Sequence, residues 1–161
     1  MPHLAKRVAG LAVMLAFHAA PAFGAGAADW PHPGTRSLAS YKSFAQLVKA
    51  TNAAIKKNSM FAVTKASASA GAKRRGIGIA GNMVIGVFRN DFAVRMLDAS
   101  VEAGIEAPLR FYLTKDGDGT ATLTYRTPSA VFARYGSAEL DAMVAELDAI
   151  FAAIADAAVR G

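Results

Sequence analysis

PLRFYLTKDGDGTATLTYR, residues Pro108–Arg126, carries the strongest local signal in this chain of 161 residues. Two runs of alternating apolar and polar residues flank DGDG, a sequence typical of β-hairpin turns. The apolar faces hold Leu109, Phe111 and Leu113 in the first run and Ala121, Leu123 and Tyr125 in the second. Pairing these faces requires opposed residue numbers with an even sum, which predicts an odd-length loop with a left-handed glycine.

The simplest such register places Leu113 opposite Leu123 and Arg110 opposite Arg126. Two facing arginines repel each other unless a negative group lies between them. The polar face that they share also contains Tyr112, Thr114, Thr122 and Thr124. Three interpretations of this face stay open: a solvated surface, a dimer surface or a ligand platform.

Periodicity and capping residues predict the helices. Apolar residues at 3.6-residue spacing predict a helix over residues 44–58 with Ser43 as N-cap, and a long helix after Ser137. Another helix is predicted from Asp91, as N-cap, to Gly104. Residues 129–136 fit a short helical turn, and residues 68–76 fit a short helix or a loop.

β-Branched and aromatic composition predicts further strands over residues 35–42, 60–67 and 82–88. The last of these is apolar on both alternations, which is typical of a strand covered on both faces. The chain shows no internal repeat. Together the elements predict a single α+β domain.

The N-terminus predicts export. Lys6 and Arg7 precede the apolar run Val8–Ala20, and small residues follow. This order predicts a signal peptide over residues 1–27, cleaved between residues 22 and 28, with an uncleaved anchor as the alternative. A linker over 28–36 and one domain over 37–161 would follow, in the periplasm or secreted, with no membrane contact after cleavage.

Composition limits the chemistry. The chain has no Cys, and cleavage removes His3 and His18, which leaves His32. Ser–His, Cys–His and multi-His sites are then unavailable within one chain, so we expect neither a metal nor a cofactor. Loss of Lys6 and Arg7 lowers the formal net charge from +6 to +4. That excess favours anions, whereas nucleic acid is not expected because no aromatic residues interleave the basic cluster.

Two glycine patterns invite other interpretations. Gly76, Gly78 and Gly81 have G-x-G-x-x-G spacing, but a strand follows them where a dinucleotide fold needs a helix. A flexible entry into the strand is favoured, with an anion-binding loop using Lys73–Arg75 as the alternative. DGDG lacks the closing Glu of a calcium loop, so a hairpin turn is favoured.

Residues 44–135 resemble the domain of unknown function 302 family. The resemblance rests on SFAQLVKATNAAIKKN (residues 43–58) and on single positions: Ala70 ahead of Gly76, Phe88, Asn90, Ala107-Pro108-Leu109, Gly119, Tyr125 and Pro128. It implies an α+β fold of β-α-β(4)-α type: a small antiparallel sheet of four to five strands with helices packed on one face, dimeric through the sheet.

The sequence also departs from this family. KASAS, residues 65–69, lacks the Asp-His pair that the family often has, so no role of that His is inherited. Arg89 and Asp91 replace a Gly and a Pro of the family pattern. The resemblance implies no reaction.

These observations favour an exported protein of unknown biochemical activity that acts as a non-enzymatic binding or accessory module for a small, anionic ligand. The candidate ligand residues are Arg89, Asn90, Arg110, Tyr112 and Arg126, with a groove near the Phe88–Asp91 corner. No catalytic residue is assigned. The alternatives are an enzyme that uses Tyr112, Asp91 and Arg89, and a purely structural homodimer.

Overall fold

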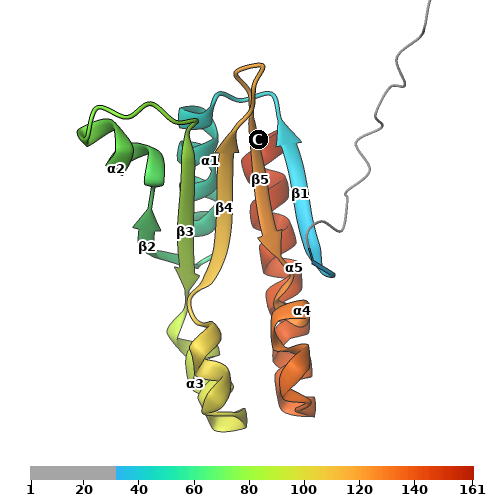
Figure 1. Cartoon of the computed structure of the whole chain (residues 1–161). Helices are drawn as coiled ribbons and strands as arrows, with labels where there is room; N and C mark the ends of the chain where they lie inside the picture. The colour runs from blue at the N-terminus through green and yellow to red at the C-terminus, as the bar shows by residue number, and fades with distance from the viewer. Residues whose placement is uncertain (1–31) are drawn as a thin grey trace, which may run out of the picture.

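A computed structural model describes residues 32–161. Its five strands form one antiparallel sheet in the order β1-β5-β4-β3-β2 (Figure 1). The strands are β1 (Thr35–Ser40), β2 (Phe61–Ala66), β3 (Asn82–Phe88), β4 (Leu109–Lys115) and β5 (Ala121–Arg126). The α-helices are α1 (Phe44–Lys57), α2 (Ala68–Arg74), α3 (Asn90–Ala99), α4 (Pro128–Phe132) and α5 (Ala138–Arg160). Two 3₁₀ helices cover Glu102–Glu106 and Ala133–Tyr135.

The β4–β5 hairpin has the predicted register. Leu113 lies opposite Leu123. The Asp116 amide donates to the Thr120 carbonyl at 2.9 Å, which closes a loop over residues 117–119. Gly119 adopts the predicted left-handed conformation at φ 92°. The odd loop therefore keeps the apolar sides of both strands on one face.

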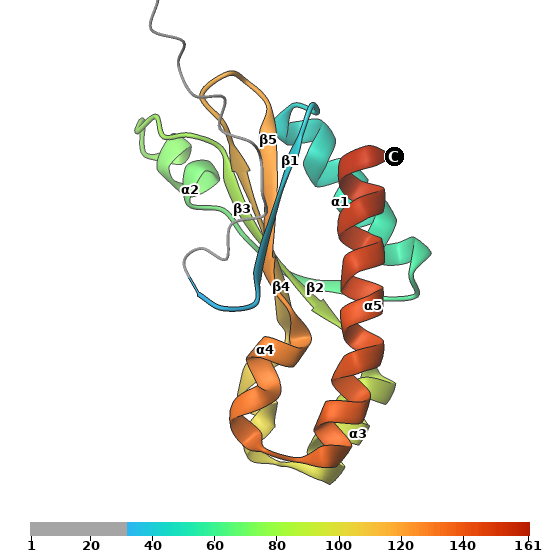
Figure 2. The same cartoon turned by 90° about the vertical axis from the view of Figure 1, so that its right-hand side faces the viewer.

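Helices α1 and α5 pack on that apolar face (Figure 2). Phe111 of β4 stacks on Phe151 of α5 with ring centroids 4.8 Å apart, and the Tyr125 and Phe111 rings meet edge to face with centroids 5.3 Å apart. The stripe predicted for the last helix is buried throughout: Leu140, Met143, Val144, Leu147, Phe151 and Ile154. The expected α+β fold, with an antiparallel sheet and its main helices on one face, is confirmed.

Two predicted N-caps are present. The Ser43 amide donates to Gln46 Oε1 at 2.9 Å, and the Gln46 amide donates to Ser43 Oγ at 3.4 Å, which completes a capping box. Ser137 accepts from the Leu140 amide at 3.3 Å. These caps fix where the two core helices begin.

The prediction for α3 was wrong at both ends. The N-cap is Arg89, whose side chain makes no capping bond, and Asp91 lies in the first turn. The Asp91 carboxylate instead accepts from Arg89 Nε at 2.7 Å and Nη2 at 2.9 Å, which removes it from capping. The helix ends at Ala99 because Ser100 is extended, and Gly104 belongs to the following 3₁₀ helix.

The opposite face of the sheet is not covered by α1 or α5 (Figure 2). On this open face Val84 is half-buried, and the Tyr112 side chain is 43% exposed. The edge strand next to β3 is β2, whose residues are all exposed, so β3 is the second strand from this edge of the sheet. No helix within residues 32–161 is both long and apolar enough to cross a bilayer.

Phe151→Ala tests the dependence of the fold on the α5–sheet contact. Removal of a ring that is 0% exposed is expected to lower the free energy of unfolding by about 3–5 kcal/mol. Phe61→Ala is the matched control, because the Phe61 side chain is 64% exposed and a surface change of this kind costs about 0.5 kcal/mol or less. Urea denaturation followed by circular dichroism measures both, and equal losses would contradict this account of the core.

Candidate functional site

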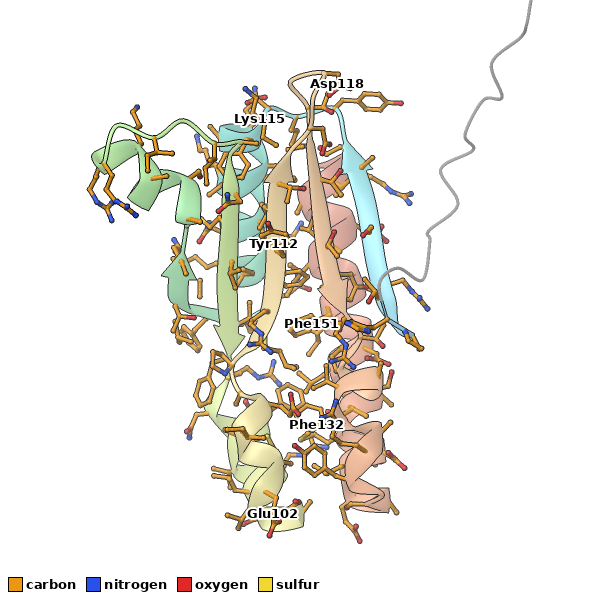
Figure 3. The ribbon with its side chains drawn as sticks, viewed as in Figure 1. Glu102, Tyr112, Lys115, Asp118, Phe132 and Phe151 are labelled. Atoms are coloured by element: carbon orange, nitrogen blue, oxygen red, sulfur yellow. The ribbon has the colours of Figure 1, made fainter. Side chains whose placement is uncertain are left out.

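A groove of about 380 Å³ lies on the open face, at the end of the sheet where β4 begins and where the end of β5 pairs with the start of β1. We call it the sheet-face groove. Its lining residues are His32, Thr35, Val84, Leu109, Arg110, Tyr112, Thr124, Tyr125, Arg126 and Val131. Tyr112 lies near the middle of β4 (Figure 3). The volume is in the range of small-ligand sites.

The pleat explains why these side chains share the groove. Tyr112 pairs with Thr124 across β4 and β5, and Thr124 pairs with Ser37 across β5 and β1. The hydroxyls of Ser37 and Thr124 lie 2.8 Å apart, which shows that they point to the same side of the sheet. Thr35 pairs with Arg126 two residues further along, so its side chain is on this side as well.

Cationic side chains line the groove, and none of its lining residues within 32–161 is a carboxylate. The exposed side chain of Arg110 makes no hydrogen bond or ion pair with another residue of the described range. Arg126 Nη2 donates to the Ala130 carbonyl at 3.3 Å, but its buried Nε has no partner among these residues. The exposed His32 lies at the same rim. The local field therefore favours an anion.

Thr35 is the most unusual polar residue of the groove. Its side chain is 2% exposed, and its buried Oγ1 has no hydrogen-bond partner within the described residues. Buried hydroxyls in native proteins are usually paired, and one left unpaired reduces stability. Thr35 Oγ1 and Arg126 Nε are thus two unsatisfied groups on adjacent strands at one end of the groove.

Gly34 holds the first strand against α4 at this end. The Thr127 amide donates to the Gly34 carbonyl at 2.8 Å, and the Ala130 amide donates to Thr127 Oγ1 at 3.3 Å. Gly34 has φ 76°, and a Cβ there would collide with the Ala130 side chain and lie 3.0 Å from Thr127 Oγ1. This contact positions Thr35 and His32 beside Arg126.

The rest of the groove lining is apolar. On the open face, Val84 contributes an aliphatic side chain and the exposed Tyr112 contributes a ring, while Leu109 and Val131, which pack in or against the core, lie at the boundary of the groove. A ligand that fills the groove would therefore contact positive groups at one part and apolar surface at another. Such a lining suits an organic anion better than a small inorganic ion.

The Phe88–Asp91 corner lies outside the sheet-face groove. Arg89 binds Asp91 through both the Nε and Nη2 atoms and lies 4.2 Å from the centroid of the Phe92 ring. The hydrogen bond from Arg89 lowers the pKa of Asp91 below its ordinary value. Behind the corner is an apolar cavity of about 40 Å³ lined by Phe92, Met60 and neighbouring core residues. Both charged groups of the corner are thus already paired.

Three of the predicted ligand residues come together and two do not. Arg110, Tyr112 and Arg126 line the sheet-face groove, whereas Arg89 and Asn90 lie at the corner. The sequence reasoning missed His32 and Thr35 as groove residues. Only the pairing of β1 with β5 brings them there, and no local pattern in the sequence encodes that pairing.

A family model described as "Domain of unknown function DUF302" matches residues 36–158. The chain belongs to the DUF302 family. The matched range includes Arg110, Tyr112 and Arg126, while His32 and Thr35 lie just before it. The resemblance noted from the sequence is confirmed.

A solved DUF302 structure has the same fold. The chain is similar to the "Crystal structure of uncharacterized conserved protein DUF302 from Bacillus stearothermophilus", with a TM-score of 0.70 and 14% identity. The alignment covers 79% of this chain and 98% of that one. At this identity the likeness establishes the fold alone. No curated protein matches the chain.

Gly34→Ala tests the contact that closes the groove. The added methyl group meets Ala130 and Thr127 at a left-handed backbone position, so we expect a lower melting temperature. Gly117→Ala is the matched control, because a Cβ at Gly117 has no heavy atom within 4 Å. Differential scanning fluorimetry compares the two variants, and an unchanged melting temperature for Gly34→Ala would show that this contact does not hold the groove end.

Proposed function

We propose that this DUF302 protein is a non-enzymatic binding or accessory module whose sheet-face groove takes a small organic anion. The observation that carries the proposal is that the buried Thr35 Oγ1 and Arg126 Nε, and the nearby Arg110 side chain, have no hydrogen-bond or ion-pair partner at these atoms within residues 32–161. A negative oxygen in the groove would pair with the exposed Arg110 guanidinium, and a shift of the side chains around Thr35 Oγ1 and Arg126 Nε, which are buried from solvent, would bring these two groups within its reach. Such an oxygen would also remove the repulsion between Arg110 and Arg126, which sit on neighbouring strands.

Guanidinium groups are well suited to this task. Their planar array of N–H donors matches the two oxygens of a carboxylate or a phosphoryl group, and charged hydrogen bonds are about twice as strong as neutral ones. The Thr35 hydroxyl could donate one further bond to the same oxygens. The apolar part of the ligand would then lie on Tyr112 and Val84.

The contacts favour binding over catalysis. An enzyme using Tyr112, Asp91 and Arg89 needs these groups within hydrogen-bond reach of one reacting atom. Arg89 and Asp91 bind each other at the corner and do not line the groove that contains Tyr112. Among the residues that the structure describes, no carboxylate lines the groove to serve as a general base beside His32.

We further propose that the protein is exported and forms a homodimer. Export rests on Lys6 and Arg7 ahead of the apolar run Val8–Ala20, which lies outside the described residues. Two features favour dimerisation: the sheet face that α1 and α5 leave open, and the exposed edge strand β2. Light scattering on the protein purified from the periplasm or the medium tests both proposals, and a cytoplasmic monomer would contradict them.

Alanine substitution of the two groove arginines tests the ligand. Hexanoate is expected to bind the wild-type protein, and Arg110→Ala and Arg126→Ala are each expected to weaken binding about tenfold to a hundredfold, the value of a charged hydrogen bond. Arg160→Ala is the matched control, because its side chain is 78% exposed at the end of α5. Isothermal titration calorimetry measures the affinities. The proposed site would be refuted if Arg160→Ala lost as much affinity as the groove variants. It would also be refuted if the wild-type protein bound neither hexanoate nor phosphate.

Thr35→Val tests separately how the unpaired hydroxyl affects the stability of the fold and how it affects anion binding. The substitution keeps the shape of the side chain and removes the orphaned oxygen, so the free protein is expected to be more stable by about 1 kcal/mol. The same change is expected to weaken anion binding. Urea denaturation and calorimetry measure the two effects, and a destabilised variant with unchanged affinity would show that the hydroxyl serves the fold instead.

A further inference from the structure

A second exposed feature lies at the other edge of the sheet. Helix α2 projects beyond β2, on the side of the sheet away from α1 and α5 (Figure 1, Figure 2). The residues at its end and in the following connection, KRRGIGIA (73–80), are all exposed. We call them the α2 loop.

The α2 loop is strongly basic and has no nearby acid in the sequence. Residues 30–90 contain ten Lys and Arg but no Asp or Glu. The side chains of Lys73, Arg74 and Arg75 make no hydrogen bond or ion pair with any residue in the described part of the chain. The exposed Lys65 on the edge strand β2 does not belong to this cluster, because it pairs with the buried Ile85 and so faces the side of the sheet that α1 and α5 cover. Three consecutive positive charges therefore lie together on the α2 loop.

The same loop exposes apolar side chains. Ile77 is 46% exposed and Ile79 is 50% exposed. A Cβ placed on Gly76 or Gly78 would have no heavy atom within 4 Å, so the loop tip projects into open space. Isolated exposed apolar residues are common, but two isoleucines next to three consecutive cations form an amphipathic surface.

The loop tip is open while its base is fixed. Asn82 Oδ1 accepts from the Ala68 amide at 2.9 Å, which ties the start of α2 to β3. The Lys115 amide donates to the Gly81 carbonyl at 2.7 Å. Gly81 lies against the Phe44 ring, where a Cβ would come within 3.0 Å of it. The cations and isoleucines are thus presented from a rigid support.

We propose that the α2 loop binds the surface of an anionic lipid bilayer. The three cations Lys73–Arg75 would contact the headgroups, and Ile77 and Ile79 would enter the boundary between headgroups and acyl chains. Juxtamembrane cations and buried apolar area are the two attractions that drive such binding. The sequence alone predicted no membrane contact after signal cleavage, because composition does not tell which side chains a loop exposes.

A bilayer fits the loop better than the other anionic partners. Nucleic acid would call for aromatic residues among the cations, and residues 73–80 contain none. A second copy could offer the acids of the C-terminal half, such as Glu139 and Asp141 on α5, but such a contact leaves the isoleucines unexplained. The proposal is independent of the sheet-face groove, since the two surfaces share no residue.

Vesicle co-sedimentation tests the proposal with the chain from Ala28 onward, because residues 32–161 contain the whole sheet and core. Vesicles of phosphatidylcholine with phosphatidylglycerol are expected to bind the protein at low salt, and pure phosphatidylcholine vesicles are not. Each cation contributes about a fivefold gain in affinity. The triple variant Lys73→Ala/Arg74→Ala/Arg75→Ala is therefore expected to lose about a hundredfold.

Two more variants separate the lipid surface from general charge. Ile77→Ser/Ile79→Ser is expected to bind anionic vesicles at least about tenfold more weakly at unchanged net charge. Lys49→Ala/Lys56→Ala/Lys57→Ala is the matched control: it removes the same charge from α1 and is expected to keep most of the affinity. Thermal melts check that each variant is folded.

Three outcomes would overturn the proposal. The first is that anionic vesicles do not sediment the wild-type protein. The second is that the α1 variant loses as much affinity as the α2-loop variant, which would reduce the effect to net charge. Salt-dependent self-association in analytical ultracentrifugation, abolished by the α2-loop variant and without vesicle binding, would assign the loop to a second copy of the chain.

Discussion

The register of the β4–β5 hairpin determines the arrangement of both faces of the sheet. With Leu113 opposite Leu123, every apolar side chain of the two central strands faces α1 and α5. A slip by one residue would turn Arg110 and Tyr112 into the core and expose Phe111, so the register is strongly specified. The core and the groove therefore both follow from one strand register, and a change in that register would alter the residues of both.

The sequence predicted what is encoded locally. The hairpin parity, the Ser43 and Ser137 caps and the α5 stripe all follow from side chains within a few turns of each other, and all are present. The start of α3 was not predictable in this way, because a carboxylate at Asp91 can cap a helix or pair with a neighbouring arginine. Here Arg89 offers two hydrogen bonds and the pairing prevails.

The candidate site was predictable only in part, for a related reason. Arg110, Tyr112 and Arg126 follow from the parity of a single hairpin. Thr35 and His32 enter through the pairing of β1 with β5, whose partners are 91 residues apart at Thr35 and Arg126. A contact over that separation depends on the whole fold, so neither spacing nor composition could identify the unsatisfied hydroxyl at Thr35.

The cysteine-free domain must obtain its stability from packing, and it does so on one face only. Because the core lies on one side of the sheet, the residues on the other face are not needed for core packing. That freedom explains how the chain can keep a buried hydroxyl without a partner, two neighbouring arginines and an exposed basic loop, each of which costs free energy in the isolated protein. Groups that cost stability and contribute nothing to the core are best explained by what they contact outside the chain, and this reasoning leads to the sheet-face groove and to the α2 loop by separate routes.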